Sequence, residues 1–170
     1  ESWTRDPDCA ICYWGEAWAW GSYLNGPMRP PEAPHAYVAV QKALGLSETH
    51  ASIRERAYIE ALSVRYVEDF KVDTRRDQDE AYAEAMRQLT EQYPDDLDAA
   101  ALYGDALFLL EPRRGTRDLN DPNVQRLHGV LEGVLARDIH HPGACHLYVH
   151  ATESTVHPGK AAACAEFLGN

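Results

Sequence analysis

Residues 93–112 read YPDDLDAAALYGDALFLLEP, and this segment has the pattern of a helix packed between neighbouring helices. Pro94 closes the preceding helix, and a largely apolar run then extends over Leu97–Leu110. A small residue such as Gly104 lets two helix backbones approach closely, and an aromatic residue such as Tyr103 fills the groove beside it. The segment therefore predicts a helix over Leu97–Leu110 in a protein made of closely packed helices.

Two other segments begin and continue in the same way. Residues 6–17 read DPDCAICYWGEA, and residues 141–152 read HPGACHLYVHAT. Each segment places a proline at the seam between two predicted helices and then continues into a helix with aromatic and small residues. This recurrence predicts a repeated packing unit of paired helices.

Helical patterns also occupy the rest of the chain, and the alternating pattern of β-strands joined by tight hairpins is absent from the sequence. Ser52 and Glu55 form a capping-box signature, and Asp121 followed by Pro122 is typical of a helix start. The sequence predicts an all-α fold with about eight helices. Their expected ranges are 9–23, 33–44, 53–64, 74–93, 97–110, 121–134, 142–153 and 158–168.

Composition limits the class of protein and the kind of partner. With 170 residues and 45% hydrophobic residues, the chain can bury one sizeable core, so we expect a single domain over residues 1–170. Its formal net charge of -11 repels phosphate backbones and anionic membrane surfaces, which argues against nucleic-acid binding. No run approaches the ~20 apolar residues that a membrane-spanning helix needs, so we expect no membrane span.

The three similar segments resemble the tetratricopeptide repeat (TPR), in which a proline step is followed by a helix carrying Tyr or Trp and Gly or Ala. The interval from Pro94 to Pro142 exceeds the repeat length of ~34 residues. Loop insertions, such as one around Arg113–Arg117, would explain the excess. The resemblance implies a TPR-like antiparallel helix-pair solenoid.

Whole phrases are similar to a family of bacterial TPR-repeat proteins of uncertain biochemical role. The phrases are DPDCAICYWGEAWAWG (6–21), RERAYIEALSVRY (54–66), YPDDLDAAALYGDALFLLEP (93–112) and HPGACHLYVHATEST (141–155). The resemblance implies that the chain is the middle of a longer member, truncated inside a repeat at both ends. It also implies an exported protein, so we expect the periplasm or the cell exterior.

The resemblance implies a scaffold or protein-interaction role rather than catalysis, because helical solenoids present extended surfaces to peptides and proteins. The segment Trp3–Cys9 has no helix to pair with the first predicted helix, and the last predicted helix has no successor. Exposed ends of complementary shape favour head-to-tail contacts between copies. The expected partner is therefore a protein or peptide, with a second copy of the chain included.

A different function is suggested by His146, His150 and Glu153, which recur at i, i+4 and i+7 of one predicted helix. Such residues share a face, so two imidazoles and a carboxylate can converge on a divalent metal ion, zinc or iron(II). The chain would then be a metal-binding protein or a metal-dependent enzyme. The candidates for a further ligand are His140, His141 and His157. The alternative is that these histidines only make structural hydrogen bonds.

The four cysteines include a CxxC pair, Cys9 and Cys12. Tyr13 stands where haem attachment needs histidine, a zinc site needs a second pair, and a thioredoxin-like site needs a βαβ setting. We interpret the pair as buried free thiols that pack as small apolar residues. The alternatives are a disulfide within the pair or with Cys145 or Cys164.

An aromatic cluster and a basic loop each have two interpretations. The aromatic cluster consists of Tyr13, Trp14, Trp18, Trp20 and Tyr23. It can form a stacking platform for a sugar or peptide, but its spacing wraps more than one side of a helix and favours core packing. The basic loop with Arg113, Arg114 and Arg117 is interpreted as a solvated surface loop, and the alternative is that it neutralises acidic neighbours.

Overall fold

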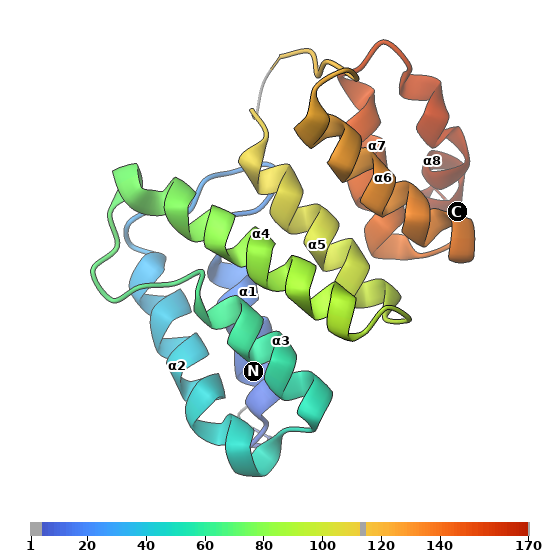
Figure 1. Cartoon of the computed structure of the whole chain (residues 1–170). Coiled ribbons are helices and arrows are strands. Elements are labelled where there is room, and N and C mark those ends of the chain that lie inside the picture. Colours follow the sequence, from blue (N-terminus) through green and yellow to red (C-terminus); the bar gives the residue numbers. More distant parts are fainter. Residues whose placement is uncertain (1–4, 113–114, 170) are drawn as a thin grey trace. The chain divides into compact units, whose positions relative to one another are not determined.

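The computed structural model describes residues 5–112 and 115–169, and within them it has eight α-helices, two short 3-10 helices and no β-strand (Figure 1). The α-helices are α1 (Ala10–Trp20), α2 (Ala33–His50), α3 (Ile53–Ser63), α4 (Arg75–Gln92), α5 (Leu97–Leu110), α6 (Pro122–Arg137), α7 (Pro142–Glu153) and α8 (Ala162–Leu168). The 3-10 helices are η2 (Val72–Thr74) and η3 (Pro158–Ala161). The prediction of an all-α fold is confirmed. No helix in these ranges has the length and apolar character needed to cross a membrane.

The chain divides into two compact units, residues 1–85 and residues 86–170. Helix α4 contributes its first residues to one unit and its last residues to the other. The single repeat domain expected over residues 1–170 remains a prediction.

In the first unit, α1 packs against α2 and α3, and α2 packs against α3. Ala10, Ala43 and Ile59 bring these three helices together in a buried apolar cluster. Leu46 also packs against this cluster, and it lies in the part of α2 beyond Gly45. The predicted end of this helix at Leu44, before Gly45, is therefore wrong: α2 continues to His50, because partial burial of Leu46 offsets the ~1 kcal/mol cost of a helical glycine.

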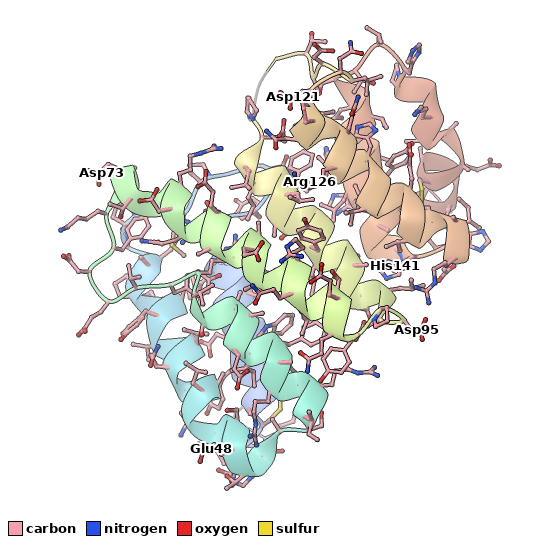
Figure 2. All side chains as sticks on the ribbon, in the orientation of Figure 1. Glu48, Asp73, Asp95, Asp121, Arg126 and His141 are labelled. Atoms are coloured by element: carbon pink, nitrogen blue, oxygen red, sulfur yellow. A yellow bond between two sulfur atoms is a disulfide. The ribbon has the colours of Figure 1, made fainter. Side chains whose placement is uncertain are left out.

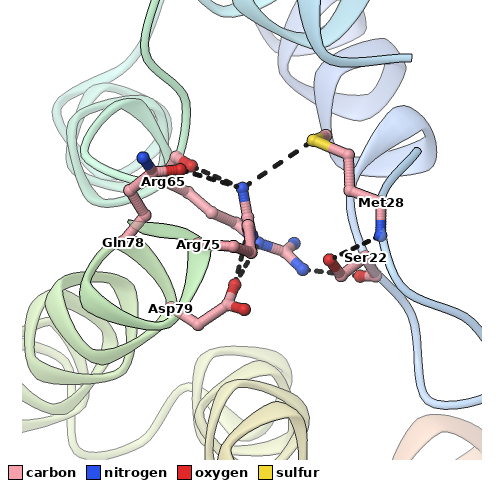
Figure 3. Close-up of polar contacts among 6 residues, drawn as sticks. All are labelled: Ser22, Met28, Arg65, Arg75, Gln78 and Asp79. Carbon is pink, nitrogen blue, oxygen red and sulfur yellow. Dashed lines mark hydrogen bonds and ion pairs between the residues drawn. The ribbon is translucent and has the colours of Figure 1, made fainter. Parts of the chain in front are cut away.

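A buried polar cluster joins three segments of the first unit (Figure 3). Arg65 donates a hydrogen bond to the carbonyl of Ser22 at 2.5 Å, and the hydroxyl of Ser22 accepts from the backbone N–H of Met28 at 3.1 Å. Arg75 donates to the carbonyl of Arg65 at 2.9 Å and to a carboxylate oxygen of Asp79 at 2.5 Å. These bonds satisfy backbone groups where the chain has no regular structure, as burial requires.

In the second unit, α5 packs against α6 and α7, α6 packs against α7, and α7 packs against α8 and η3. The close approach expected at Gly104 is present, because a Cβ atom there would lie only 2.6 Å from Cδ2 of Leu131 in α6. Arg137, the last residue of α6, donates to the carbonyl of Pro94 at 2.7 Å and to Asp95 at 2.9 Å. The end of α6 is thereby tied to the turn before α5.

Side chains cap several helices where the sequence places capping residues. Ser52 and Glu55 form the predicted reciprocal capping box at the start of α3. Asp121 accepts from the backbone N–H of Asn123 at the start of α6, as its position before Pro122 predicts. These boundaries depend on local chemistry, which explains why the sequence predicts them well.

Candidate functional site

Helix α7 brings His146, His150 and Glu153 next to one another. The ring centroids of His146 and His150 are 5.0 Å apart, with the ring planes at 68°. Nδ1 of His150 lies 2.8 Å from a carboxylate oxygen of Glu153, which is hydrogen-bonding distance. The helical spacing that suggested a shared face therefore does place the three side chains together.

The surroundings of His146 and His150 favour the forms of the two imidazoles that bind metal ions. A carboxylate on Nδ1 of His150 fixes the tautomer in which Nε2 carries a lone pair, an arrangement common in histidine ligands of metals. Although His146 is exposed, loss of hydration at its ring lowers its pKa, and the neighbouring charge of His150 lowers it further. Both effects favour the neutral imidazole of His146, which is the form that binds metal.

His141, one of the candidates for a further ligand, has both ring nitrogens engaged. It is the N-cap of α7, at the position labelled in Figure 2, and its Nδ1 accepts from the backbone N–H of Ala144 at 3.2 Å. Its Nε2 lies 3.2 Å from a carboxylate oxygen of Asp98 in α5. The expectation that His141 is available to a metal ion is therefore wrong, because its ring is already used to cap α7 and to contact α5.

The other two candidates are engaged elsewhere or exposed. The ring of His140 lies 4.9 Å from that of Phe167, and His157 is solvent-exposed ahead of η3. Within residues 5–112 and 115–169, no group of three or more His, Cys, Asp or Glu side chains is arranged to hold a metal ion. A metal site at His146 and His150 thus remains a prediction.

A second polar network links α6, α7 and η3. The phenol of Tyr148 donates to a carboxylate oxygen of Glu132 at 2.6 Å, and the ammonium group of Lys160 lies 3.3 Å from the same oxygen. Beside them, Nε2 of His128 donates to the carbonyl of Ala151 at 3.2 Å, and its ring meets that of Tyr148 edge-on at 5.7 Å. This network was not predicted from the sequence, although the four-residue spacing of His128 and Glu132 places them on one face of α6.

Burial and hydrogen bonding shift the pKa values of this network. Burial lowers the pKa of His128, and its hydrogen bond to the carbonyl only partly opposes this effect. Burial raises the pKa of Glu132, but the hydrogen bonds from Tyr148 and Lys160 outweigh burial, so the pKa lies below its ordinary value. Burial, and then the contact with Glu132, raise the pKa of Tyr148. The network therefore holds a neutral imidazole, a carboxylate and a protonated phenol.

Arg117 ties the loop before α6 to the end of α7. Its guanidinium donates to the carbonyl of His150 at 3.0 Å and to the hydroxyl of Ser154 at 2.5 Å, and it lies over the ring of Phe108 at 4.5 Å. Terminal carbonyls of a helix attract cations, so this contact stabilises the end of α7. The interpretation of Arg117 as solvated is wrong. Arg113 and Arg114 lie outside the described residues.

All four cysteines form disulfides, one between Cys9 and Cys12 and the other between Cys145 and Cys164. The interpretation of Cys9 and Cys12 as buried free thiols is therefore corrected: they are bonded to each other and only partly buried. Cys145 and Cys164 are buried and connect α7 to α8. CxxC spacing is compatible with free thiols, a metal site or a disulfide, and the sequence contained no signal that separated them.

The aromatic residues of α1 are more exposed than core packing requires. Trp14 stacks with Trp18 at 6.5 Å and meets Tyr58 of α3 edge-on at 5.8 Å, whereas Trp20 stacks on His35 at 4.8 Å. The exposed members are Trp18 (38%), Trp20 (38%) and Tyr23 (58%). The expectation that the whole cluster is core is wrong for these three, because α2 and α3 cover only part of α1 and Tyr23 lies beyond the end of that helix.

Comparison with known proteins adds no relative: no family model, no curated protein and no solved structure matches the chain.

Proposed function

We propose that this chain is a helical-repeat interaction module of the TPR-like type that binds a protein or peptide. The observation that carries the proposal is the order of helix packing. In the first unit α1 packs against α2 and α3, and in the second unit α5 packs against α6 and α7. In each unit, the first of these three helices thus contacts the next helix in sequence and the one after it, as neighbouring helices do in a solenoid of helix pairs.

Surface chemistry supports a neutral or basic polypeptide as the partner. The net charge of -11 attracts cationic segments and speeds their association at low salt. Trp18, Trp20 and Tyr23 expose aromatic surface on the first unit, and such side chains are enriched in protein-binding surfaces. The two disulfides favour an oxidising compartment as the place where partner and chain meet.

Capture and self-association measurements test this proposal together. Cross-linked capture from the source cells compares wild type with the variant Trp18→Ala/Trp20→Ala, and Val72→Ala provides a matched change at another exposed apolar residue. Sedimentation velocity at several concentrations measures self-association of the same three proteins. We expect a partner, or a second copy, whose binding the double variant weakens and Val72→Ala does not. Absence of any protein partner and of self-association would refute the interaction role.

A divalent metal site at His146 and His150 is the second candidate function. The adjacent imidazoles and the pairing of His150 with Glu153 favour it. Calorimetric titration with Zn²⁺ and anaerobic Fe²⁺ should detect binding to wild type that His146→Ala and His150→Ala both abolish and that the exposed control His157→Ala retains. Affinity should fall at acidic pH, because only neutral imidazoles bind metal. Equal metal binding by all four proteins would show that His146 and His150 are structural residues and not metal ligands.

A further inference from the structure

The two disulfides occupy different settings. Cys145 and Cys164 are 0% and 2% exposed and join two helices of the second unit. Cys9 and Cys12 are only partly buried and lie at the first turn of α1. Attack on a disulfide requires access to a sulfur atom, so this difference alone favours reaction at Cys9 and Cys12.

The two bonds also differ in what they contribute to folding. Cys9 and Cys12 are separated by three positions in sequence, whereas Cys145 and Cys164 are separated by 19. A crosslink restricts the unfolded chain less when the loop it closes is shorter. The first bond is also not needed to hold α1, because Ala10 already packs with residues of α2 and α3. Structural stability is therefore a weak explanation for the bond between Cys9 and Cys12.

The helix start favours release of a thiolate from Cys9. Cys9 is the N-cap of α1, and its side chain makes no capping hydrogen bond while it is bonded to Cys12. A thiolate at this position faces the positive end of the helix dipole and the N–H groups of the first turn. Helix starts are a setting in which protein thiolates are stabilised and CxxC pairs react.

Charges beside the disulfide set which thiols can approach. Arg5, Asp6 and Asp8 precede Cys9 and are exposed, which gives the segment one positive and two negative side chains. The backbone N–H of Asp8 donates to the carboxylate of Asp6 at 3.1 Å, so that carboxylate is held close to the helix start. Together with the net charge of -11, these carboxylates repel an anionic thiol and favour a neutral or cationic one.

We propose that the bond between Cys9 and Cys12 is a thiol–disulfide exchange site that accepts two electrons from a neutral or cationic dithiol, and that the bond between Cys145 and Cys164 is structural. The donor thiolate attacks Sγ of Cys12, the disulfide breaks, and Cys9 leaves as a thiolate that takes up a proton. The second donor thiolate then attacks the donor sulfur of the mixed disulfide and releases Cys12. The chain ends as a dithiol, and the donor ends as a disulfide.

Selective reduction of the oxidised, folded chain tests this assignment. Dithiothreitol, a neutral dithiol, is added at pH 7, samples are quenched with iodoacetamide, and peptide mass spectrometry follows alkylation of each cysteine. We expect Cys9 and Cys12 to be reduced at least about tenfold faster than Cys145 and Cys164, because burial denies access to the second pair. Equal reduction rates, or reduction of Cys9 and Cys12 only after the chain unfolds in guanidinium, would overturn the proposal.

Two monothiols of similar size test the charge preference. Cysteamine is cationic, 3-mercaptopropionate is anionic, and their rate constants are compared per thiolate at low and high salt. The cationic thiol should reduce the bond between Cys9 and Cys12 faster than the anionic thiol. High salt should bring the two rate constants closer together, because salt screens the charges. The variant Asp6→Asn/Asp8→Asn should accelerate the anionic thiol. Equal rates for both thiols at low salt, or no effect of this variant, would contradict the proposed selectivity.

Discussion

At the residue scale, His141 shows how one side chain can define a helix start and at the same time contact a neighbouring helix. Its Nδ1 accepts from Ala144 inside α7, and its Nε2 lies beside Asp98 of α5. These two contacts require the neutral ring with its proton on Nε2. Capping and the contact with α5 thus explain this residue, which the sequence offered only as one candidate for a further metal ligand.

Replacement of the cap should destabilise the second unit. His141→Ala removes the acceptor for the Ala144 N–H and should lower the free energy of unfolding by about 1–2 kcal/mol, whereas His141→Asn keeps a capping side chain and should lose less. Urea denaturation followed by circular dichroism measures both. His157→Ala, at an exposed position, serves as the control. An unchanged stability of His141→Ala would show that the capping contact contributes nothing.

His128 should make stability depend on pH. Burial holds its pKa below the unfolded value of about 6.5, so the unfolded chain binds a proton that the folded chain does not. The contribution of the neutral His128 ring to the free energy of unfolding is fully present above about pH 6.5. It is lost as pH falls below that value, with a slope of at most about 1.4 kcal/mol per pH unit.

Unfolding measurements between pH 7 and 5 check the role of His128. His128→Gln can keep a donor to the carbonyl of Ala151 but cannot titrate, so its stability should vary less with pH than that of wild type. His146→Gln controls for the other histidine with a lowered pKa. If wild type and His128→Gln lose stability in parallel over this range, His128 does not cause the pH dependence of stability.

At the scale of helices, sequence predicted what local chemistry determines and failed where neighbouring helices decide. The capping box at Ser52 and the start of α6 at Asp121 follow from side chains within one turn. The extension of α2 past Gly45 follows from burial of Leu46, and the exposure of Trp18 follows from how much of α1 its neighbours cover. The candidate metal ligands on α7 share a face because the spacing of side chains along a helix is set by local geometry. The contacts of the three candidates for a further ligand depend on tertiary packing, which local sequence does not determine.

Two helical glycines test the packing of α5 on α6. Gly104→Ala places a methyl group 2.6 Å from Leu131 and should lower the free energy of unfolding by about 1–3 kcal/mol. Gly133→Ala meets nothing within 4 Å on the exposed face of α6 and should raise it by about 0.5–1 kcal/mol. Chemical denaturation compares the two variants. Stabilisation by both changes would mean that the backbones do not approach closely at Gly104.

At the scale of the whole molecule, the account rests on helices that pack with their near neighbours in sequence. Such an architecture is quasi-one-dimensional, so a local perturbation should weaken adjacent helices first and have less effect farther along the chain. In a protein with one continuous cooperative core, the same local perturbation would instead weaken every helix. This difference separates the proposed repeat module from an ordinary globular helical domain.

Native-state hydrogen exchange of wild type and Gly104→Ala, read by mass spectrometry for each helix, tests this claim most directly. The variant perturbs α5 at its contact with α6. The account predicts that exchange accelerates most in α5, α6 and α7, which contact one another, and changes least in α1 and α2. An equal acceleration in every helix would contradict the proposed repeat architecture and the interaction role inferred from it.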